Sequence, residues 1–200
     1  MKIYSINITD VEKNLFEQWF CNMSDERKDS VSQTQSSHKK KLRIAADMLC
    51  RKGISDFCNI AESEIKIELS PLGKPYAKNL PVHFSISHSG DYALCAVSGS
   101  EIGVDIEKIR AVHPRAHEKF CTENESRYIS GSENGFFKIW TLKEAYFKCI
   151  GTGLGADIKD VSFEINNSEI ICSEKGYEFS FFPIDENYIC SVCKKKELFI

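Results

Sequence analysis

Acidic side chains alternate along one short segment of the chain, Ile102–Glu107 (IGVDIE). If the segment is a strand, alternate side chains share a face, so its isoleucines and its valine point into a core. Asp105 and Glu107 then point together to the other face, where Gly103 leaves open space. Two carboxylates in this arrangement offer the hard oxygen ligands that Mg²⁺ prefers. A charged edge strand facing solvent has the same pattern, so the segment alone leaves both interpretations open.

A second group of polar side chains lies in a segment that predicts a helix, Phe136–Ile150. Helical spacing places Trp140, Glu144 and Lys148 on one stripe. Most of the helix is apolar, so a glutamate and a lysine within it are expected to be partnered or functional rather than a plain surface pair.

Two further segments have the composition of anion contacts. Ser85–Gly90 (SISHSG) is the end of a predicted strand entering a turn, where His88, the hydroxyl of Ser87 and free backbone N–H groups can hold a phosphate. Pro71–Pro75 (PLGKP) is a rigid loop that presents Lys74. A hairpin with polar turn residues and a loop with an exposed lysine are the plain alternatives.

The order and spacing of these four motifs resemble the phosphopantetheinyl transferases: Gly-Lys-Pro, Phe-x-Ile-Ser-His-Ser, Ile-Gly-Val-Asp-Ile-Glu and Trp-x-x-Lys-Glu-Ala-x-x-Lys. The pattern is similar to the monomeric, two-lobed surfactin-synthetase type rather than to the short trimeric holo-acyl-carrier-protein synthases. The resemblance covers residues 70–155 and extends more loosely to both ends. It implies a Mg²⁺-dependent enzyme that transfers the 4'-phosphopantetheine group of coenzyme A to a serine of an apo acyl or peptidyl carrier protein. Adenosine 3',5'-bisphosphate would be released.

The resemblance also implies a role for each motif residue. Asp105, Glu107 and Glu144 would bind Mg²⁺, for which Mn²⁺ is a candidate replacement. Glu144 and Lys148 would be catalytic, Glu144 as the candidate general base and Lys148 at the phosphate or in proton transfer. The coenzyme A contacts would come from Lys74, Pro75, Ser87, His88, Lys143, Lys148 and Arg43.

The first long helix departs from the family pattern. The family often has an arginine there that reaches the 3'-phosphate of coenzyme A, and counting back from Asp47 places Leu42 at that position. Arg43, one residue further, is therefore the candidate. Basic residues near position 30 that help to hold the adenine in the family are absent, and Lys28 is a candidate substitute; the residues found there are Ser30, Ser32 and Gln33.

The family resemblance places the carrier protein near Arg110–Thr122. Carrier proteins are acidic helical bundles, so Arg110 and Arg115 would supply charge and Phe120 an apolar anchor. The carrier itself stays open among those of fatty-acid, polyketide and nonribosomal-peptide synthesis. The alternative to catalysis is a protein that binds coenzyme A or a carrier protein without turning it over.

The elements that must position these residues predict an α+β fold. Helices are expected at 11–22, 38–60, 114–120, 123–128 and 136–150, and strands at 2–8, 65–69, 82–87, 92–98, 102–107, 161–165, 169–172, 177–183 and 188–193. Residues 24–37 are either a weak helix or a loop. We expect two similar lobes packed side by side, 1–100 and 101–200, with the active site in the cleft between them. A weak repeat at an offset of 95 residues leaves a duplication open; it matches Phe84, Ser85, Cys95 and Val97 with Phe179, Ser180, Cys190 and Val192.

Composition excludes several classes of protein. A formal net charge of −3 argues against the broad basic face of a nucleic-acid-binding protein. No apolar stretch approaches the roughly 20 residues of a membrane span. Nine scattered cysteines suit a reducing compartment better than a disulfide framework, so we expect a cytoplasmic protein. The two-lobed resemblance implies a monomer.

Three weaker motifs have other possible meanings. His113, His117 and Cys121 have the spacing of a transition-metal site on a helix, but Pro114 places His113 before the helix. Cys190-x-x-Cys193 is expected to be part of a strand rather than a redox or zinc pair. Gly151–Gly155 (GTGLG) follows a helix instead of a strand, the wrong context for a dinucleotide-binding loop.

A serine hydrolase is the competing enzyme class. It would use Ser87 or Ser89 with His88 and Asp105. Neighbouring serine and histidine side chains on a strand point apart, and the sequence has no Gly-x-Ser-x-Gly motif.

Overall fold

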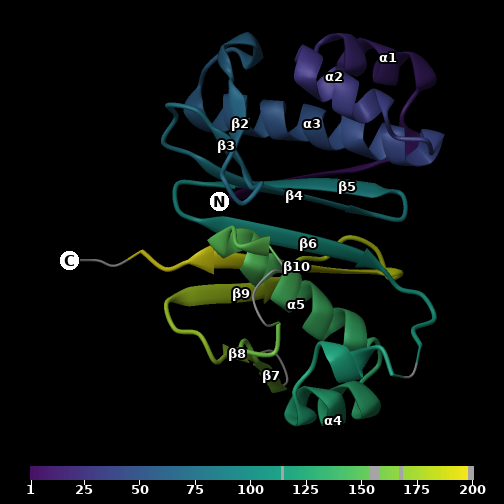
Figure 1. Cartoon of the computed structure of the whole chain (residues 1–200), viewed down its shortest axis with the longest axis vertical. Helices are drawn as coiled ribbons and strands as arrows, with labels where there is room; N and C mark the ends of the chain where they lie inside the picture. Colours follow the sequence, from purple (N-terminus) through teal and green to yellow (C-terminus); the bar gives the residue numbers. More distant parts are fainter. Residues whose placement is uncertain (114, 154–157, 167–168, 198–200) are drawn as a thin grey trace.

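Two antiparallel sheets lie edge to edge in the computed structural model, which describes residues 1–113, 115–153, 158–166 and 169–197 (Figure 1). The order of the first sheet is β1 (Lys2–Asn7), β5 (Tyr92–Ser98), β4 (His83–Ser89), and that of the second is β6 (Ile102–Lys108), β10 (Tyr188–Lys195), β9 (Tyr177–Phe181). β4 and β6 lie side by side in the middle of the molecule. We call the elements from β1 to β5 the first lobe and those from β6 to β10 the second lobe.

One long helix covers each sheet. α3 (Ser37–Cys58) packs on the first sheet and α5 (Gly135–Ile150) on the second. The side chain of Ser36 caps the start of α3, and Asn59 ends the helix in the left-handed conformation. α5 ends at Gly151, whose φ of 79° is a conformation that glycine adopts without strain.

Shorter elements complete the lobes. The first lobe adds α1 (Lys13–Cys21), α2 (Asp25–Ser32) and the hairpin of β2 (Ile67–Leu69) and β3 (Pro75–Ala77). The second adds α4 (Glu123–Gly131) and the hairpin of β7 (Phe163–Asn166) and β8 (Glu169–Cys172). α2 resolves the open question about residues 24–37 in favour of a short helix. The helix expected at 114–120 is instead a 3-10 turn at His117–Lys119, and Pro114 lies outside the described residues.

The two lobes repeat the same architecture, although the repeat read from the sequence is wrong for one strand. Phe84 of β4 faces Val97 of β5, whereas Phe179 of β9 faces Cys193 of β10 rather than Val192. Phe84 and Val97 pack toward α3, and Phe179 and Cys193 pack toward α5. The second hairpin is therefore one residue longer. A single offset cannot match both of its strands, so Cys95/Cys190 and Val97/Val192 are not equivalent pairs.

Three apolar clusters hold the fold together. One lies between α3 and the first sheet and a second between α5 and the second sheet. The third joins the two lobes, and its buried members are Leu94, Ala96, Ile102, Val104, Ile106, Tyr188, Cys190 and Val192. The expectation of an α+β fold with two similar lobes is confirmed. None of the helices in the described part of the chain combines the length and hydropathy that a membrane span requires.

Candidate active site

Three serines on β4 join the lobes at their contact. Ser85, Ser87 and Ser89 alternate along β4, so they share its face toward β6. Their hydroxyl oxygens accept hydrogen bonds from three alternate backbone N–H groups of β6, those of Val104 at 3.1 Å, Ile106 at 3.3 Å and Lys108 at 3.0 Å. We call these three serines the serine ladder. It fixes the position of the acidic strand relative to the first lobe.

Asp105 is the most buried of the acidic residues predicted to bind a metal, with 5% of its surface exposed. Its Oδ1 accepts hydrogen bonds from Ser87 Oγ at 2.8 Å and from Lys148 Nζ at 2.7 Å. Its Oδ2 is buried and has no hydrogen-bond partner among the described residues. Burial raises the pKa of Asp105, and the ammonium of Lys148 opposes that rise. A buried carboxylate oxygen without a partner is costly unless a ligand occupies it.

Glu144 and Glu107 face the same cavity as Asp105, a space of about 280 Å³ that also borders Lys148 and His88. Burial raises the pKa of Glu144 to about 7, and the carboxylates of Asp105 and Glu107 add to the rise. Oε2 of Glu107 accepts hydrogen bonds from Ser89 Oγ at 2.9 Å and from the Arg110 guanidinium at 2.7 Å. The cavity therefore concentrates negative charge beside one lysine.

This donor set fits a hard divalent cation. Within the described residues, no group of three or more His, Cys, Asp or Glu side chains is arranged closely enough to hold a metal ion as it stands. Three carboxylates nevertheless line one cavity, and Asp105 Oδ2 is a buried oxygen without a hydrogen-bond partner among the described residues. A cation there would give that buried oxygen a partner. It would also offset the repulsion between the carboxylates, which adds to the effect of burial in raising the pKa of Glu144. Oxygen donors of this kind select Mg²⁺ or Mn²⁺ rather than soft metals.

His88 lines the same cavity. More than a third of its surface is solvent-exposed, but desolvation by the surrounding side chains still lowers its pKa. The positive charges of Lys148 and Arg43 act in the same direction. Ser87, predicted with His88 as a phosphate contact, already donates to Asp105 and accepts from Lys148 at 3.0 Å. The structure thus gives Ser87 a place among the carboxylates rather than a free hydroxyl.

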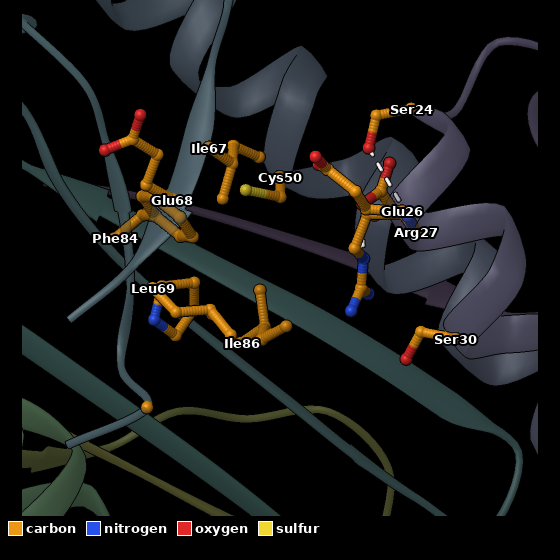
Figure 2. Close-up of a pocket in the computed structure, with 13 residues that line it drawn as sticks. Ser24, Glu26, Arg27, Ser30, Cys50, Ile67, Glu68, Leu69, Phe84 and Ile86 are labelled. Carbon is orange, nitrogen blue, oxygen red and sulfur yellow. Dashed lines mark hydrogen bonds and ion pairs between the residues drawn. The ribbon is translucent and has the colours of Figure 1, made fainter. Parts of the chain in front are cut away.

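A groove runs from this cavity into the first lobe. The next space, about 210 Å³, is bordered by Lys148, Gly151, Lys74 and Pro75. It shares Pro75 with a larger cavity of about 800 Å³ between α2, α3, β4 and the β2–β3 hairpin (Figure 2). The three spaces adjoin along β4, where Ile86 borders each of them.

Arg27 is a residue of the large cavity that sequence reasoning missed. Figure 2 shows its guanidinium extending from α2 into the space opposite Ile67 and Leu69 of β2. Its Nε lies 3.2 Å from Asp47 Oδ1, and Arg51 Nε lies 3.0 Å from the other oxygen of that carboxylate. The only signal in the sequence was the general loss of basic residues near position 30. That loss pointed to Lys28, which instead pairs with Asp25 at 3.6 Å.

Arg43 ties α3 to α2. Its guanidinium donates to the backbone oxygen of Ser30 at 2.9 Å, to the Ser30 hydroxyl at 2.7 Å and to Thr34 Oγ1 at 2.6 Å. Leu42, the other alignment candidate, is buried in the core of the first lobe. Arg43 therefore contributes positive charge near His88 while its own donors hold the helix pair together.

Comparisons with known proteins match both lobes of the chain. Residues 101–193 match the family model "4'-phosphopantetheinyl transferase superfamily", and residues 11–100 match "4'-phosphopantetheinyl transferase, N-terminal". The chain is 30% identical over 166 residues to the 4'-phosphopantetheinyl transferase ffp of Bacillus subtilis, covering 75% of this chain and 72% of that one. The chain belongs to the 4'-phosphopantetheinyl transferase superfamily.

Two longer matches span nearly the whole chain of this transferase homologue. It is 28% identical over 196 residues to the 4'-phosphopantetheinyl transferase gsp of Aneurinibacillus migulanus, covering 92% of this chain and 81% of the relative. It is also 28% identical over 212 residues to the 4'-phosphopantetheinyl transferase Sfp of Bacillus subtilis, covering 96% and 92%. The resemblance to the two-lobed type is confirmed.

Lys143, one of the phosphopantetheinyl transferase motif residues, does not reach the groove. Its side chain is fully buried, and its ammonium donates to the carbonyl oxygens of Ile158 at 2.9 Å and Val161 at 2.6 Å. It also lies 3.0 Å from the fully buried carboxylate of Glu125. We therefore correct the expectation that Lys143 contacts coenzyme A, because its donors are used inside the second lobe.

Lys74 also has partners in this transferase fold. Its Nζ donates to the carbonyl oxygens of Cys149 at 2.7 Å and Ile102 at 3.4 Å, and burial lowers its pKa. It thus links the β2–β3 hairpin of the first lobe to the end of α5. Lys74 and Pro75 both border the groove.

The competing interpretations of the weaker motifs lose support. Ser87 and Ser89 donate to Asp105 and Glu107, so neither hydroxyl is paired with His88 as a hydrolase would require. All nine cysteines are free thiols. Cys190 packs between the lobes whereas Cys193 packs against α5, so the two thiols lie on opposite faces of the sheet.

The structure also gives no support to a transition-metal site or a dinucleotide-binding loop at the two remaining motifs. His113 accepts a hydrogen bond from the backbone of Arg115, and burial raises the pKa of the Cys121 thiol to about 11. His113, His117 and Cys121 do not form a metal cluster among the described residues. Gly151 and Gly153 follow α5, and Gly155 lies outside the described residues.

Proposed function

We propose that the protein transfers the 4'-phosphopantetheine group of coenzyme A to a serine of an apo acyl or peptidyl carrier protein, releasing adenosine 3',5'-bisphosphate. The observation that carries the proposal is the buried, unpartnered oxygen of Asp105 in a cavity shared with Glu107, Glu144 and Lys148. This cavity opens onto a groove with room for an extended nucleotide cofactor. Family membership supports the same reaction class.

Asp105, Glu107 and Glu144 would hold Mg²⁺, with Mn²⁺ as a candidate replacement. When bound, the cation supplies charge neutralisation for the pyrophosphate of coenzyme A. The carboxylates come from two elements, β6 and α5, whose contact is among the tightest in the molecule because Gly103 lets the helix approach. The site is therefore preorganised by the packing of the second lobe.

The chain's own residues account for the proton and the leaving group. The serine oxygen of the carrier forms a bond to the β-phosphorus, and the bond from that phosphorus to the bridging oxygen breaks. The serine proton passes to Glu144, directly or through one water. The electron pair leaves on the bridging oxygen of adenosine 3',5'-bisphosphate, where Lys148 supplies positive charge.

Cofactor contacts are proposed along the groove. His88, Lys148 and Arg43 provide positive or hydrogen-bonding groups near the phosphates, and Pro75 with the stem of Lys74 borders the ring system. Arg27 is added as a contact in the large cavity. Arg27 is the proposed replacement for the basic side chains that the family carries near position 30.

The carrier protein is proposed to dock near Arg110–Thr122, of which all but Pro114 is described. Arg115 is exposed, and Arg110 is 60% exposed although its guanidinium also contacts Glu107 at 2.7 Å, so both can face an acidic partner. Phe120 is half-buried against Trp140, with ring centroids 5.0 Å apart, and is a weaker anchor than the sequence indicated.

We further propose that the protein acts as a cytoplasmic monomer with a domain boundary between residues 100 and 101. The free state of all nine cysteines supports a reducing compartment. Analytical ultracentrifugation of the purified chain tests the monomer, because a stable dimer would sediment with twice the mass.

Intact mass spectrometry of a carrier protein tests the reaction. Purified enzyme, coenzyme A and Mg²⁺ are incubated with apo acyl and peptidyl carrier proteins, and each carrier is expected to gain one phosphopantetheine if it is a substrate. Asp105→Asn and Glu144→Gln, which keep the shape of the side chains, are expected to abolish the gain. Arg127→Ala, at an exposed pair remote from the groove, is the matched control.

The alternative, a protein that binds coenzyme A or a carrier without chemistry, predicts a different result. Coenzyme A would bind in calorimetry, but no carrier would gain mass at any Mg²⁺ concentration. That outcome with a broad panel of carriers would contradict the proposed transfer.

A further inference from the structure

The three members of the serine ladder differ in one respect. Ser87 donates a hydrogen bond to Asp105, and Ser89 donates one to Glu107. Each of these two hydroxyl oxygens also accepts a hydrogen bond from a backbone N–H group of β6. The Ser85 hydroxyl oxygen likewise accepts a hydrogen bond from a backbone N–H group of β6, that of Val104. The β6 residue at the corresponding position for Ser85 is Gly103, which has no carboxylate to receive a proton. The ladder thus contains its own internal comparison.

Ser89 is well placed to hold Glu107 still. A serine hydroxyl has one proton, and the backbone N–H of Lys108 directs that proton toward Glu107 by occupying the oxygen of Ser89. Arg110 contacts the same oxygen of Glu107, but Arg110 is 60% exposed and its ion pair is screened by solvent. Ser89 is half-buried on a strand, so its hydrogen bond is the more rigid of the two.

We propose that Ser89 is a positioning residue for metal binding: its hydroxyl, from the first lobe, orients the carboxylate of Glu107 in the second lobe. The inference rests on the proposed function, because it concerns the same carboxylate cavity. Hydrogen bonds to ligand side chains commonly change metal affinity 10- to 100-fold. The first lobe therefore contributes to the metal site as well as to the groove.

A titration with Mn²⁺ alone tests the proposal, with the free ion followed by electron paramagnetic resonance and no coenzyme A present. Ser89→Ala is expected to raise the Mn²⁺ dissociation constant about tenfold. Ser89→Thr keeps the hydroxyl and is expected to bind within about twofold of the unmodified protein. In a Glu107→Ala background, Ser89→Ala is expected to have no further effect, because it acts through that carboxylate.

Ser85→Ala is the matched control, because it removes the same type of hydrogen bond between the lobes without touching a carboxylate. It is expected to leave the Mn²⁺ affinity unchanged. The proposal is overturned if Ser85→Ala weakens binding as much as Ser89→Ala, or if Ser89→Ala binds Mn²⁺ normally. Absence of Mn²⁺ binding by the unmodified protein would instead contradict the metal assignment in the proposed function, and this inference with it.

Discussion

The two long helices cover equivalent sheets but achieve close contact in opposite ways. In the first lobe the glycine at the contact is on the helix, where a Cβ on Gly53 would meet only side chains, those of Val97 at 2.8 Å and Tyr4 at 3.1 Å. In the second lobe it is on the strand. A Cβ on Gly103 would overlap the backbone oxygen of Ala145 and lie 2.5 Å from the Cys149 nitrogen. The second contact is therefore less able to adjust.

The helices also bury charge differently. Asp47 of α3 is 4% exposed, yet its partner Arg27 borders the large cavity and is 33% exposed. Lys143 of α5 and its partner Glu125 are both completely enclosed. In the first lobe the buried carboxylate of Asp47 lies beside the large cavity, an arrangement that suits ligand binding. The second lobe has closed around its pair, which suits a rigid support for the carboxylates of the site.

The largest effect is expected from breaking the enclosed pair. Lys143→Met leaves Glu125 charged in the core without its main counter-ion, and about 3–5 kcal/mol of unfolding free energy should be lost. Urea denaturation followed by circular dichroism measures it. Adding Glu125→Gln removes the unpaired charge and should recover part of the loss; its single amide oxygen can still accept one of the two backbone hydrogen bonds that Thr122 and Phe163 donate to Glu125. A fully additive double variant would contradict the pairing.

The glycine contacts give the next largest difference. Gly103→Ala is expected to cost about 3 kcal/mol, because the new methyl group meets backbone that cannot move aside. Gly53→Ala should cost about 1 kcal/mol or less, since the neighbouring side chains can shift and alanine favours the helix by about that amount. Thermal unfolding of the two variants side by side checks the order. Equal costs would show that the two packings are equally adaptable.

Arg27 tests whether the open pair serves a ligand rather than stability. Arg27→Ala is expected to change the unfolding free energy by less than about 1 kcal/mol, because its ion pair is part-exposed and Asp47 keeps Arg51. Coenzyme A binding, measured by calorimetry, should weaken about tenfold through loss of a charged hydrogen bond. Lys28→Ala, one residue away on α2, should bind coenzyme A normally. If both variants bound coenzyme A more weakly, the effect would come from the positive charge of α2 as a whole rather than from a specific contact of Arg27.

The smallest effect is expected at an exposed pair of the second lobe. Glu123 and Arg127 are 92% and 75% exposed on α4, with 3.6 Å between their charged atoms. Arg127→Ala should change the unfolding free energy by no more than about 0.5 kcal/mol in urea denaturation. A larger loss would mean that the enclosed and exposed pairs of the second lobe differ less than their burial indicates.

Local spacing predicted which side chains share a cavity better than it predicted which side chains are buried. The i, i+4 relation brought Glu144 and Lys148 to one cavity, and strand alternation did the same for Asp105 and Glu107. Trp140, on the same stripe, instead packs edge-on against Phe120 and stacks on Phe136. These periodicities are properties of single elements, so a sequence displays them directly.

The features that were missed depend on distant partners. Lys143 is one residue from Glu144, so it points about 100° away around the helix, and its burial depends on Glu125 from another helix. Arg27 could be placed only after α2 was known to pack beside Asp47. The one-residue shift between the lobes comes from hairpin length, which identical residues at a single offset conceal.

The central strand of each sheet is made last within its lobe, and this has a consequence for synthesis on the ribosome. Lys2 pairs with Val97 in the first lobe, and Lys108 pairs with Tyr188 in the second. Neither sheet can assemble until its final strand has emerged, and such long-range pairing is slow. The first lobe is expected to fold while the second is still being translated. During that interval the apolar side chains of Leu94 and Ala96, which later pack against the second lobe, are exposed to water. Chaperone binding is therefore expected to matter most for this nascent intermediate.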